Sequence, residues 1–218
     1  MNDLIAAIGP STFLWPVALL GVLSLAIAIE RFYFLRFRAS LPTDPFMSAI
    51  QKLVMAGQID AAIVMCINAP KALVANVVRA ALLAADADRE DLRLAIDQST
   101  AEAVPVAQLR LGWLTSLANV ATLMGLLGTI VGLMQSFAAV SHADPSQRQT
   151  LLAGGIALAM RTTASGIAVA IPSLLAYAYL AQRANTLLDD VDRCGMKMEM
   201  LLVSGRRMRA APVSETGA

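Results

Sequence analysis

The chain has 218 residues, of which 57% are hydrophobic and 15% are charged, with a formal net charge of +1. An ordinary soluble domain carries about 25% charged residues, so this composition predicts a membrane protein and excludes a strongly basic nucleic-acid binder and a charge-rich disordered chain. Two cysteines and one histidine argue against a disulfide framework, a histidine-based metal site or a histidine-dependent catalytic triad, and we expect no metal and no cofactor.

Three charge-free stretches are long enough to cross a bilayer, which takes roughly 20 apolar residues. They are residues 4–29, 111–141 and 162–182. The first stretch has no Lys or Arg before its apolar core and runs directly into Glu30 and Arg31, unlike a cleaved signal peptide. We therefore expect a retained helix of about residues 12–34, with Glu30 paired at the inner interface.

The distribution of Lys and Arg predicts the orientation. None precedes residue 31, nine lie in residues 31–110, one lies in the 141–150 turn and six lie in residues 183–209. The positive-inside rule then places the N-terminus outside and the long loop and the tail in the cytoplasm. The expected parts are an outside N-terminus with the first span (1–38), a cytoplasmic helical insert (39–110), the second and third spans with a short outside turn (111–182), and a cytoplasmic helical extension and tail (183–218).

The insert is predicted to be helical. Apolar residues recur at helical spacing over 46–54, 59–67 and 73–82, with breaks at Gly57 and Pro70. From about Asp88 the pattern continues to Val140, which predicts a single helix about 80 Å long that Pro105 kinks but does not end. Residues 183–203 are expected to extend the third span. The predicted fold is therefore an all-α membrane protein with three transmembrane helices and long cytoplasmic helical extensions.

The second span carries a stripe of small and hydroxylic residues. Hydroxyl groups recur every seven residues and small residues interleave three positions later: Thr115, Thr122, Thr129 and Ser136, with Ala118, Gly125, Gly132 and Ala139. Such a stripe is typical of close helix packing, because small residues let backbones approach. The hydroxyls also suit a narrow, partly wet cavity, and the two roles are compatible if different parts of the stripe serve each.

The third span repeats this chemistry beside a charge. Thr162 and Thr163 lie between Gly155 and Gly166, and Arg161 precedes them. An intramembrane charge is a candidate functional residue. Because Arg161 lies at the outer end of its stretch, extension of its guanidinium to the interface is the alternative.

No Asp or Glu lies within the three charge-free stretches. Proton relays in membranes use carboxylates or histidines, so a proton path here needs a titrating group from another polypeptide. The phosphate-loop, nucleophile-elbow and H-E-x-x-H motifs do not occur. A membrane enzyme would need polar residues that converge on one site, and the sequence shows no such set. We expect Cys66 and Cys194 to be ordinary thiols.

Two motifs in the spans resemble those of the MotA/TolQ/ExbB proton-channel family, most closely its TolQ/ExbB branch. Residues 125–134, Gly-Leu-Leu-Gly-Thr-Ile-Val-Gly-Leu-Met, with Phe137 following, are similar to the second-span signature. Residues 155–157, Gly-Ile-Ala, then Thr163, Gly166 and residues 170–172, Ala-Ile-Pro, resemble the third-span signature. The order of segments is similar over essentially the whole chain.

This resemblance implies a stator or channel subunit in the bacterial inner membrane. Members form a homopentamer around a central pore that holds a dimer of single-span partners similar to ExbD or TolR, each with a membrane aspartate. Ion flow drives rotation, and force passes to the cell envelope for import, envelope maintenance or gliding motility. The missing carboxylate in this chain agrees with that arrangement.

The resemblance also implies roles for individual residues. Threonines matching Thr129 and Thr163 face the partner's aspartate, and we add Thr162 and Arg161 as candidates for the ion pathway. The remaining candidates form the helix-packing or pore stripe: Gly125, Gly128, Gly132, Thr122, Ser136, Gly155 and Gly166.

The chain departs from the family at two positions and leaves one rival function open. Family members commonly have an acidic residue where Leu158 stands and an apolar residue where Arg161 stands, which bears on ion entry from the outside. The rival is a non-conducting helical scaffold that positions other envelope proteins. A scaffold needs the small residues but not the hydroxyls, so the threonines discriminate between the two.

Overall fold

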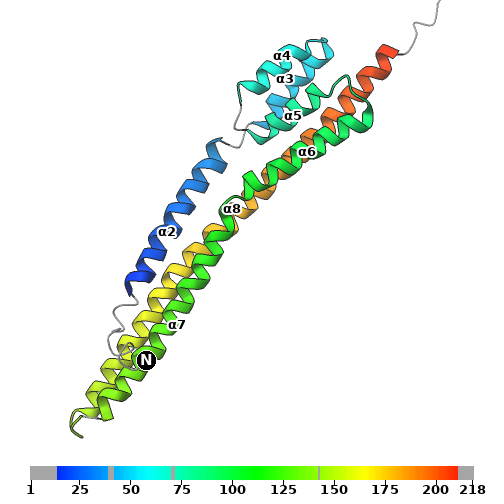
Figure 1. Ribbon diagram of the computed structural model, residues 1–218. Helices are drawn as coiled ribbons and strands as arrows, with labels where there is room; N and C mark the ends of the chain where they lie inside the picture. Colours follow the sequence, from blue (N-terminus) through cyan, green and yellow to red (C-terminus); the bar gives the residue numbers. More distant parts are fainter. Residues whose placement is uncertain (1–13, 39–41, 70–71, 142, 211–218) are drawn as a thin grey trace, which may run out of the picture. The chain divides into compact units, whose positions relative to one another are not determined.

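A computed structural model describes residues 14–38, 42–69, 72–141 and 143–210, and every regular element in these ranges is a helix (Figure 1). The elements are α2 (Leu14–Tyr33), continued by a π-helical segment (Phe34–Arg38), α3 (Thr43–Met55), α4 (Ile59–Ile67), α5 (Leu73–Leu83), α6 (Arg89–Gln108), α7 (Leu111–Ser141) and α8 (Arg148–Ala210). The predicted all-α fold is therefore confirmed for the described residues.

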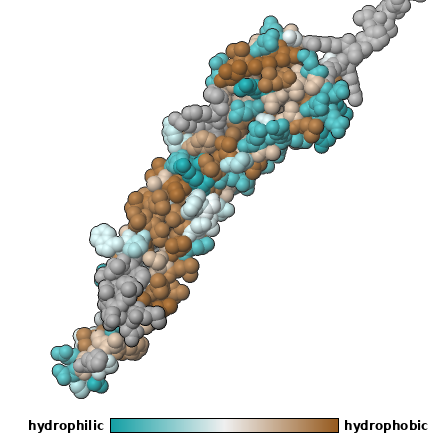
Figure 2. All heavy atoms as spheres, in the orientation of Figure 1, coloured by the Kyte–Doolittle hydropathy of each residue, from teal (hydrophilic) through white to brown (hydrophobic). Residues whose placement is uncertain are grey.

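Among the described residues, three helical runs are long and apolar enough to cross a membrane, and they contain α2, α7 and α8. Helix α7 has the bounds of the second predicted stretch, and the third stretch lies inside α8. Helix α2 starts two residues after the predicted start at Thr12, which lies outside the described residues. The visible face of these helices is largely hydrophobic in Figure 2, as a lipid-facing or subunit-facing surface requires.

The chain divides into two compact units. The spanning unit holds α2 up to Arg31, then Arg110–Leu180, and the insert unit holds Phe32–Leu109 and the residues from Ala181 onward. Helix α8 contributes to both units, since it runs unbroken from Arg148 to Ala210. The expected helical extension over residues 183–203 is thereby confirmed as a helix.

The single helix predicted from Asp88 to Val140 is wrong, because the chain breaks between α6 and α7. Arg110 has a φ of 60°, in the left-handed region that costs an L-residue roughly 1–2 kcal/mol. Its Nη1 donates to both carboxylate oxygens of Glu30, at 2.7 and 2.6 Å. This ion pair stabilises the strained backbone, while α6 continues past Pro105 to Gln108 as expected.

Glu30 is paired near the C-terminal end of α2, as expected from the sequence, but its partner comes from a distant part of the chain. The carboxylate binds Arg110, 80 positions away along the chain, and both side chains are about half exposed. The neighbouring Arg31 is itself buried. Three charged groups therefore mark one end of the spanning unit.

Helices α3 to α6 pack in chain order in the insert unit, each against the next. Its core contains large apolar side chains that are almost fully buried: Ile50, Val77, Val78, Leu82, Leu92, Val191 and Met198. A Cβ added to Gly195 of α8 would lie 2.8 Å from Cγ2 of Ile96. The glycine therefore permits close approach between α8 and α6.

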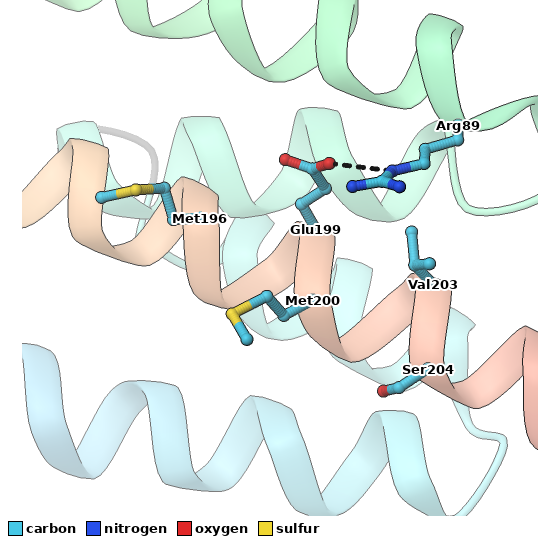
Figure 3. A pocket seen from close by; sticks show the side chains of 6 residues that line it. All are labelled: Arg89, Met196, Glu199, Met200, Val203 and Ser204. Atoms are coloured by element: carbon cyan, nitrogen blue, oxygen red, sulfur yellow. Dashed lines mark hydrogen bonds and ion pairs between the residues drawn. The ribbon is translucent and has the colours of Figure 1, made fainter.

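One shallow groove of the insert unit lies beside α8 (Figure 3). Arg89 and Glu199 form an ion pair at its edge, with Nε and Oε1 3.4 Å apart. Glu199 points toward Arg89, and Met200 points away from that pair (Figure 3). Because the pair satisfies both charges and the remaining lining is mostly apolar, the groove holds no catalytic constellation.

Helix α2 packs on the α8 part of the spanning unit through a narrow seam. Val17, Ser24 and Arg31 are its buried residues, at intervals of seven. A Cβ on Gly21 would lie 3.1 Å from Cγ2 of Val169, and the hydroxyl oxygens of Ser24 and Ser173 are 2.5 Å apart. Its other sides expose large apolar side chains: Trp15, Leu19, Val22, Leu23, Leu25 and Ile29.

Candidate functional site between α7 and α8

Helices α7 and α8 meet along a seam of residues with little or no side chain. A Cβ on Gly132 would lie 3.0 Å from Cβ of Ala159, and a Cβ on Gly125 would lie 3.1 Å from the carbonyl oxygen of Thr162. These contacts run in opposite directions along the two helices, as an antiparallel pair requires. Residues without a β-carbon allow the two backbones to approach closely. The van der Waals packing that results is one of the forces that hold helices together in lipid.

Two glycines of this seam accommodate hydroxyl side chains from the facing helix. A Cβ on Gly128 would lie 2.6 Å from Oγ1 of Thr162, and a Cβ on Gly155 would collide with Oγ of Ser136. Gly166 is the tightest against a backbone, because its Cβ would lie 2.6 Å from the carbonyl oxygen of Ala121. The seam therefore consists of small residues and the hydroxyls they receive.

The stripe predicted on α7 divides into a buried part and a flanking part. Ala118, Gly125, Gly132 and Ser136 are buried in the seam. Thr115 and Thr129 are partly buried, whereas Thr122 and Ala139 are exposed. The reason is the helical repeat: seven residues fall about 20° short of two full turns, so successive hydroxyl positions move round the helix and only Ser136 reaches the buried seam.

Most hydroxyls of α7 donate to their own backbone. Thr122 Oγ1 donates to the Ala118 carbonyl at 3.1 Å, Thr129 Oγ1 to that of Leu126 at 2.6 Å, and Ser136 Oγ to that of Gly132 at 2.7 Å. Such back-bonding satisfies the donor in an apolar environment. Each oxygen keeps lone pairs that can accept a hydrogen bond from water or from a protonated carboxyl group.

Two threonines of α8, Thr162 and Thr163, face Gly125 from the other side of the seam. Thr163 Oγ1 donates across to the Gly125 carbonyl at 3.1 Å. Thr162 is almost fully buried and donates to the Ala159 carbonyl at 2.7 Å, with the Gly125 carbonyl more distant at 3.5 Å. Within the described chain no hydrogen bond joins Thr129 to Thr163, although Thr163 contacts Gly125 and Thr129 lies one helical turn beyond Gly125.

Arg161 is exposed, one position before the buried Thr162. The position of Arg161 along the axis of α8 can be compared with α2 through the contact of Val169 with Gly21. Arg161 lies eight residues before Val169, which is about 12 Å along the axis. That level matches the first described residues of α2. Arg161 and Arg183 enclose the apolar stretch of α8, about 33 Å from one to the other, close to the ~30 Å hydrocarbon thickness.

Sequence reasoning missed three features of this unit. The Ser24–Ser173 contact, the break at Arg110 and the distant partner of Glu30 all depend on residues far apart in the chain. The only local signal for the ion pair is that each charge lies at the end of an apolar stretch. No group of three or more His, Cys, Asp or Glu that could hold a metal ion occurs among the described residues.

Comparisons with known proteins place these features in one family. The model of the "MotA/TolQ/ExbB proton channel family" matches residues 68–193, more than half of the chain, including all the candidate residues. "Tol-Pal system protein TolQ" of Haemophilus influenzae is 33% identical over 123 residues, which is 56% of this chain and 47% of that protein. "Putative biopolymer transport protein ExbB homolog" of Methanothermobacter thermautotrophicus is 26% identical over 178 residues, 81% of this chain and 62% of that protein.

The match to a further relative covers about three quarters of each of the two proteins. "Putative biopolymer transport protein ExbB-like 3" of Synechocystis sp. is 32% identical over 162 residues, 73% of this chain and 76% of that protein. The chain spans only about half of the TolQ relative and less than two thirds of the archaeal one.

Proposed function

This chain belongs to the MotA/TolQ/ExbB proton channel family, in its TolQ/ExbB-like branch, and from that premise we propose that it is the stator or channel subunit of an ion-driven motor. In this proposal five copies surround a pore in the bacterial inner membrane. The pore holds a dimer of single-span partners similar to ExbD or TolR. Ion flow through the assembly does mechanical work on the cell envelope, in import, envelope maintenance or gliding motility.

The observation that carries this proposal is the threonine contact inside an apolar seam that has no carboxylate. Thr163 donates to Gly125 from the facing helix, and Thr129 lies one turn further along α7 with free lone pairs. No Asp or Glu lies in the three charge-free stretches. A titrating group must therefore come from a second polypeptide, and the partner's membrane aspartate is the group that the family supplies.

The proposed mechanism uses the hydroxyls to hold water or an ion beside that aspartate. A carboxylate in hydrocarbon resists ionisation unless hydrogen bonds replace its lost hydration. Thr129 and Thr163 would supply such bonds, with Thr162 next to them and Arg161 at the outer end of the path. Protonation and deprotonation of the aspartate would then alternate with rotation of one component inside the other.

Residue size supports the proposed positions of the spans around the pore. Helix α2 exposes bulky side chains such as Trp15, Leu19 and Leu25, which suit lipid. The small residues gather on α7 and α8 instead. We therefore place α2 on the outside of the ring and α7 and α8 at the pore, with the N-terminus outside and the insert in the cytoplasm.

Thr→Val substitution tests the proposal, because valine keeps nearly the same shape and removes the hydroxyl. We expect Thr129→Val and Thr163→Val to leave expression and oligomer size unchanged, at a stability cost of about 1 kcal/mol or less. Both should abolish ion-driven work in cells that also express the single-span partner. Thr186→Val is the matched control, since Thr186 of the insert unit also back-bonds to its own helix, at 3.0 Å.

The rival function, a non-conducting scaffold, is favoured by one observation: the hydroxyls of Thr122, Thr129 and Ser136 each donate to a carbonyl of their own helix. Packing alone would need no more. Normal ion-driven work in both single variants and in the double variant would refute the ion path and leave the scaffold ahead.

A further inference from the structure

An exposed amide side chain interrupts the apolar surface of α7. Asn119 is exposed, and it lies nine residues beyond Arg110, about 13 Å along the helix axis. The Glu30–Arg110 ion pair marks one end of the spanning unit, so Asn119 lies well inside the ~30 Å hydrocarbon layer. A primary amide there is costly if it contacts lipid, because its donors and acceptors find no partner.

A second, independent observation lies one helical turn closer to Arg110. The hydroxyl oxygen of Thr115 is buried, yet within the described chain it has no hydrogen-bond partner. It differs in this respect from Thr122, whose hydroxyl donates to the Ala118 carbonyl. A buried hydroxyl without a partner indicates a polar group or a water molecule that the isolated chain does not supply.

Thr115, Asn119 and Thr122 share one side of α7, since they are spaced four and three residues apart. We call these three residues the inner polar face. Further outward Leu126 interrupts this side before Thr129, which lies seven residues after Thr122, and Leu133 follows. The polarity therefore extends from the charged end of the unit toward the middle of the membrane and is broken by an apolar residue between Thr122 and Thr129.

We propose that the inner polar face is wetted from the cytoplasmic side and lines the inner leg of the ion path. The inference rests on the proposed function for its orientation and for the ion that uses the path. The ligand is water and, in transit, a hydrated monovalent cation or proton, held by one amide and two hydroxyl groups. The apolar continuation at Leu126 ends the water-filled leg before the level of Thr129, where the partner's carboxylate would take over.

Cysteine accessibility tests the wetting directly, because only a thiolate reacts with thiosulfonate reagents and a thiolate forms only where water reaches it. In inside-out vesicles treated with a charged, impermeant thiosulfonate, Asn119→Cys and Thr122→Cys should react at least tenfold faster than Val120→Cys. Val120 is the matched control, since it is also exposed at the same depth but lies about 100° round the helix. Leu126→Cys should also be unreactive.

The native thiols leave a low background in this assay. Cys66 and Cys194 are buried, and burial raises the pKa of Cys66 to about 11 and also raises that of Cys194. Equal reactivity at Val120 and Asn119 would overturn the proposal, because the whole helix surface would then be wet. Lack of reaction at Asn119 and Thr122 would overturn it as well.

A functional pair of variants completes the test. We expect Asn119→Leu to lower ion-driven work at least tenfold with the oligomer intact, and Asn119→Ser to restore most of it. Loss of the oligomer in Asn119→Leu would instead assign the amide to contacts between copies and overturn the wet face. Labelling of Asn119→Cys, together with a wild-type complex that does no ion-driven work, would sink the proposed function alone. A working wild-type complex whose Asn119→Cys variant is not labelled would sink only this inference.

Discussion

The two sides of α7 use small and polar residues for different purposes. On the side facing α8, glycines 125, 128 and 132 are buried against backbone or short side chains. Thr122 lies about a quarter turn away and Asn119 about 145° away, and both are exposed on a helix whose other exposed residues are mostly large and apolar. The first side is closed by contact within one chain, whereas none of the described residues covers the second.

The difference shows that the role of a polar residue in a membrane helix depends on whether its side chain faces a neighbouring helix or the outside of the chain. Ser136 and Thr162 are buried and hydrogen-bonded inside the seam, so their hydroxyls are accounted for by packing. Thr122 and Asn119 face outward, where lipid would leave the amide without partners. The packed side therefore explains how the spans associate, and the exposed side indicates where water, a partner or another copy must come.

The largest effect is expected from adding one methyl group where the backbones of α7 and α8 are in closest contact. In Gly166→Ala the new Cβ would lie 2.6 Å from the Ala121 carbonyl oxygen, a backbone atom that cannot rotate away. Overpacking of this kind typically costs 1–3 kcal/mol or more. We expect α7 and α8 to separate, with loss of the folded oligomer in size-exclusion chromatography and a lower melting temperature in detergent.

Gly154→Ala is the matched control for that substitution. Gly154 lies on the same helix, and nothing comes within 4 Å of its added Cβ. The control should behave like the wild type, with a slight gain if anything, because alanine favours the helix. If Gly166→Ala assembled as well as Gly154→Ala, the close approach at this seam would not exist.

The sequence predicted the packed side well and the exposed side poorly. Glycines and alanines at three- and four-residue spacing indicate a helix contact wherever they occur in a span, so Gly125 and Gly132 could be assigned without a structure. The spacing of seven residues assigns the threonines to the same stripe. Only the position of α8 decides that Ser136 falls inside the contact and Thr122 outside it.

The break before α7 could not have been predicted from local sequence. The break falls at Leu109 and Arg110, and leucine and arginine both favour helices. No glycine or proline stands at these two positions to signal a break. The left-handed conformation of Arg110 is stabilised by Glu30, which lies in another helix. Tertiary contact therefore overrides helix propensity here, and the periodicity that predicted one long helix contained no sign of it.

Arg161 offers an intermediate test on α8, where an exposed charge lies beside the packed Thr162. We expect Arg161→Leu to raise passive proton entry several-fold in vesicles that lack the partner, because a cationic side chain at the outer part of a pore repels cations. Arg161→Lys keeps the charge and should leak no more than the wild type. A leucine variant that conducts and works like the wild type would place the guanidinium at the lipid interface instead.

The smallest expected effect concerns the start of α7, which determines the rotation that points Gly128 at α8 and Asn119 away from it. Arg110→Ala and Glu30→Gln both remove the ion pair between two half-exposed side chains, at a cost of about 1 kcal/mol or less. Arg110→Gly removes the same pair but relieves the left-handed backbone, which glycine adopts without strain. We therefore expect thermal unfolding in detergent to rank Arg110→Gly about 1 kcal/mol above Arg110→Ala, with Glu30→Gln close to the alanine variant. Equal stability of the glycine and alanine variants would mean that Arg110 carries no backbone strain and that α6 and α7 can join as one helix.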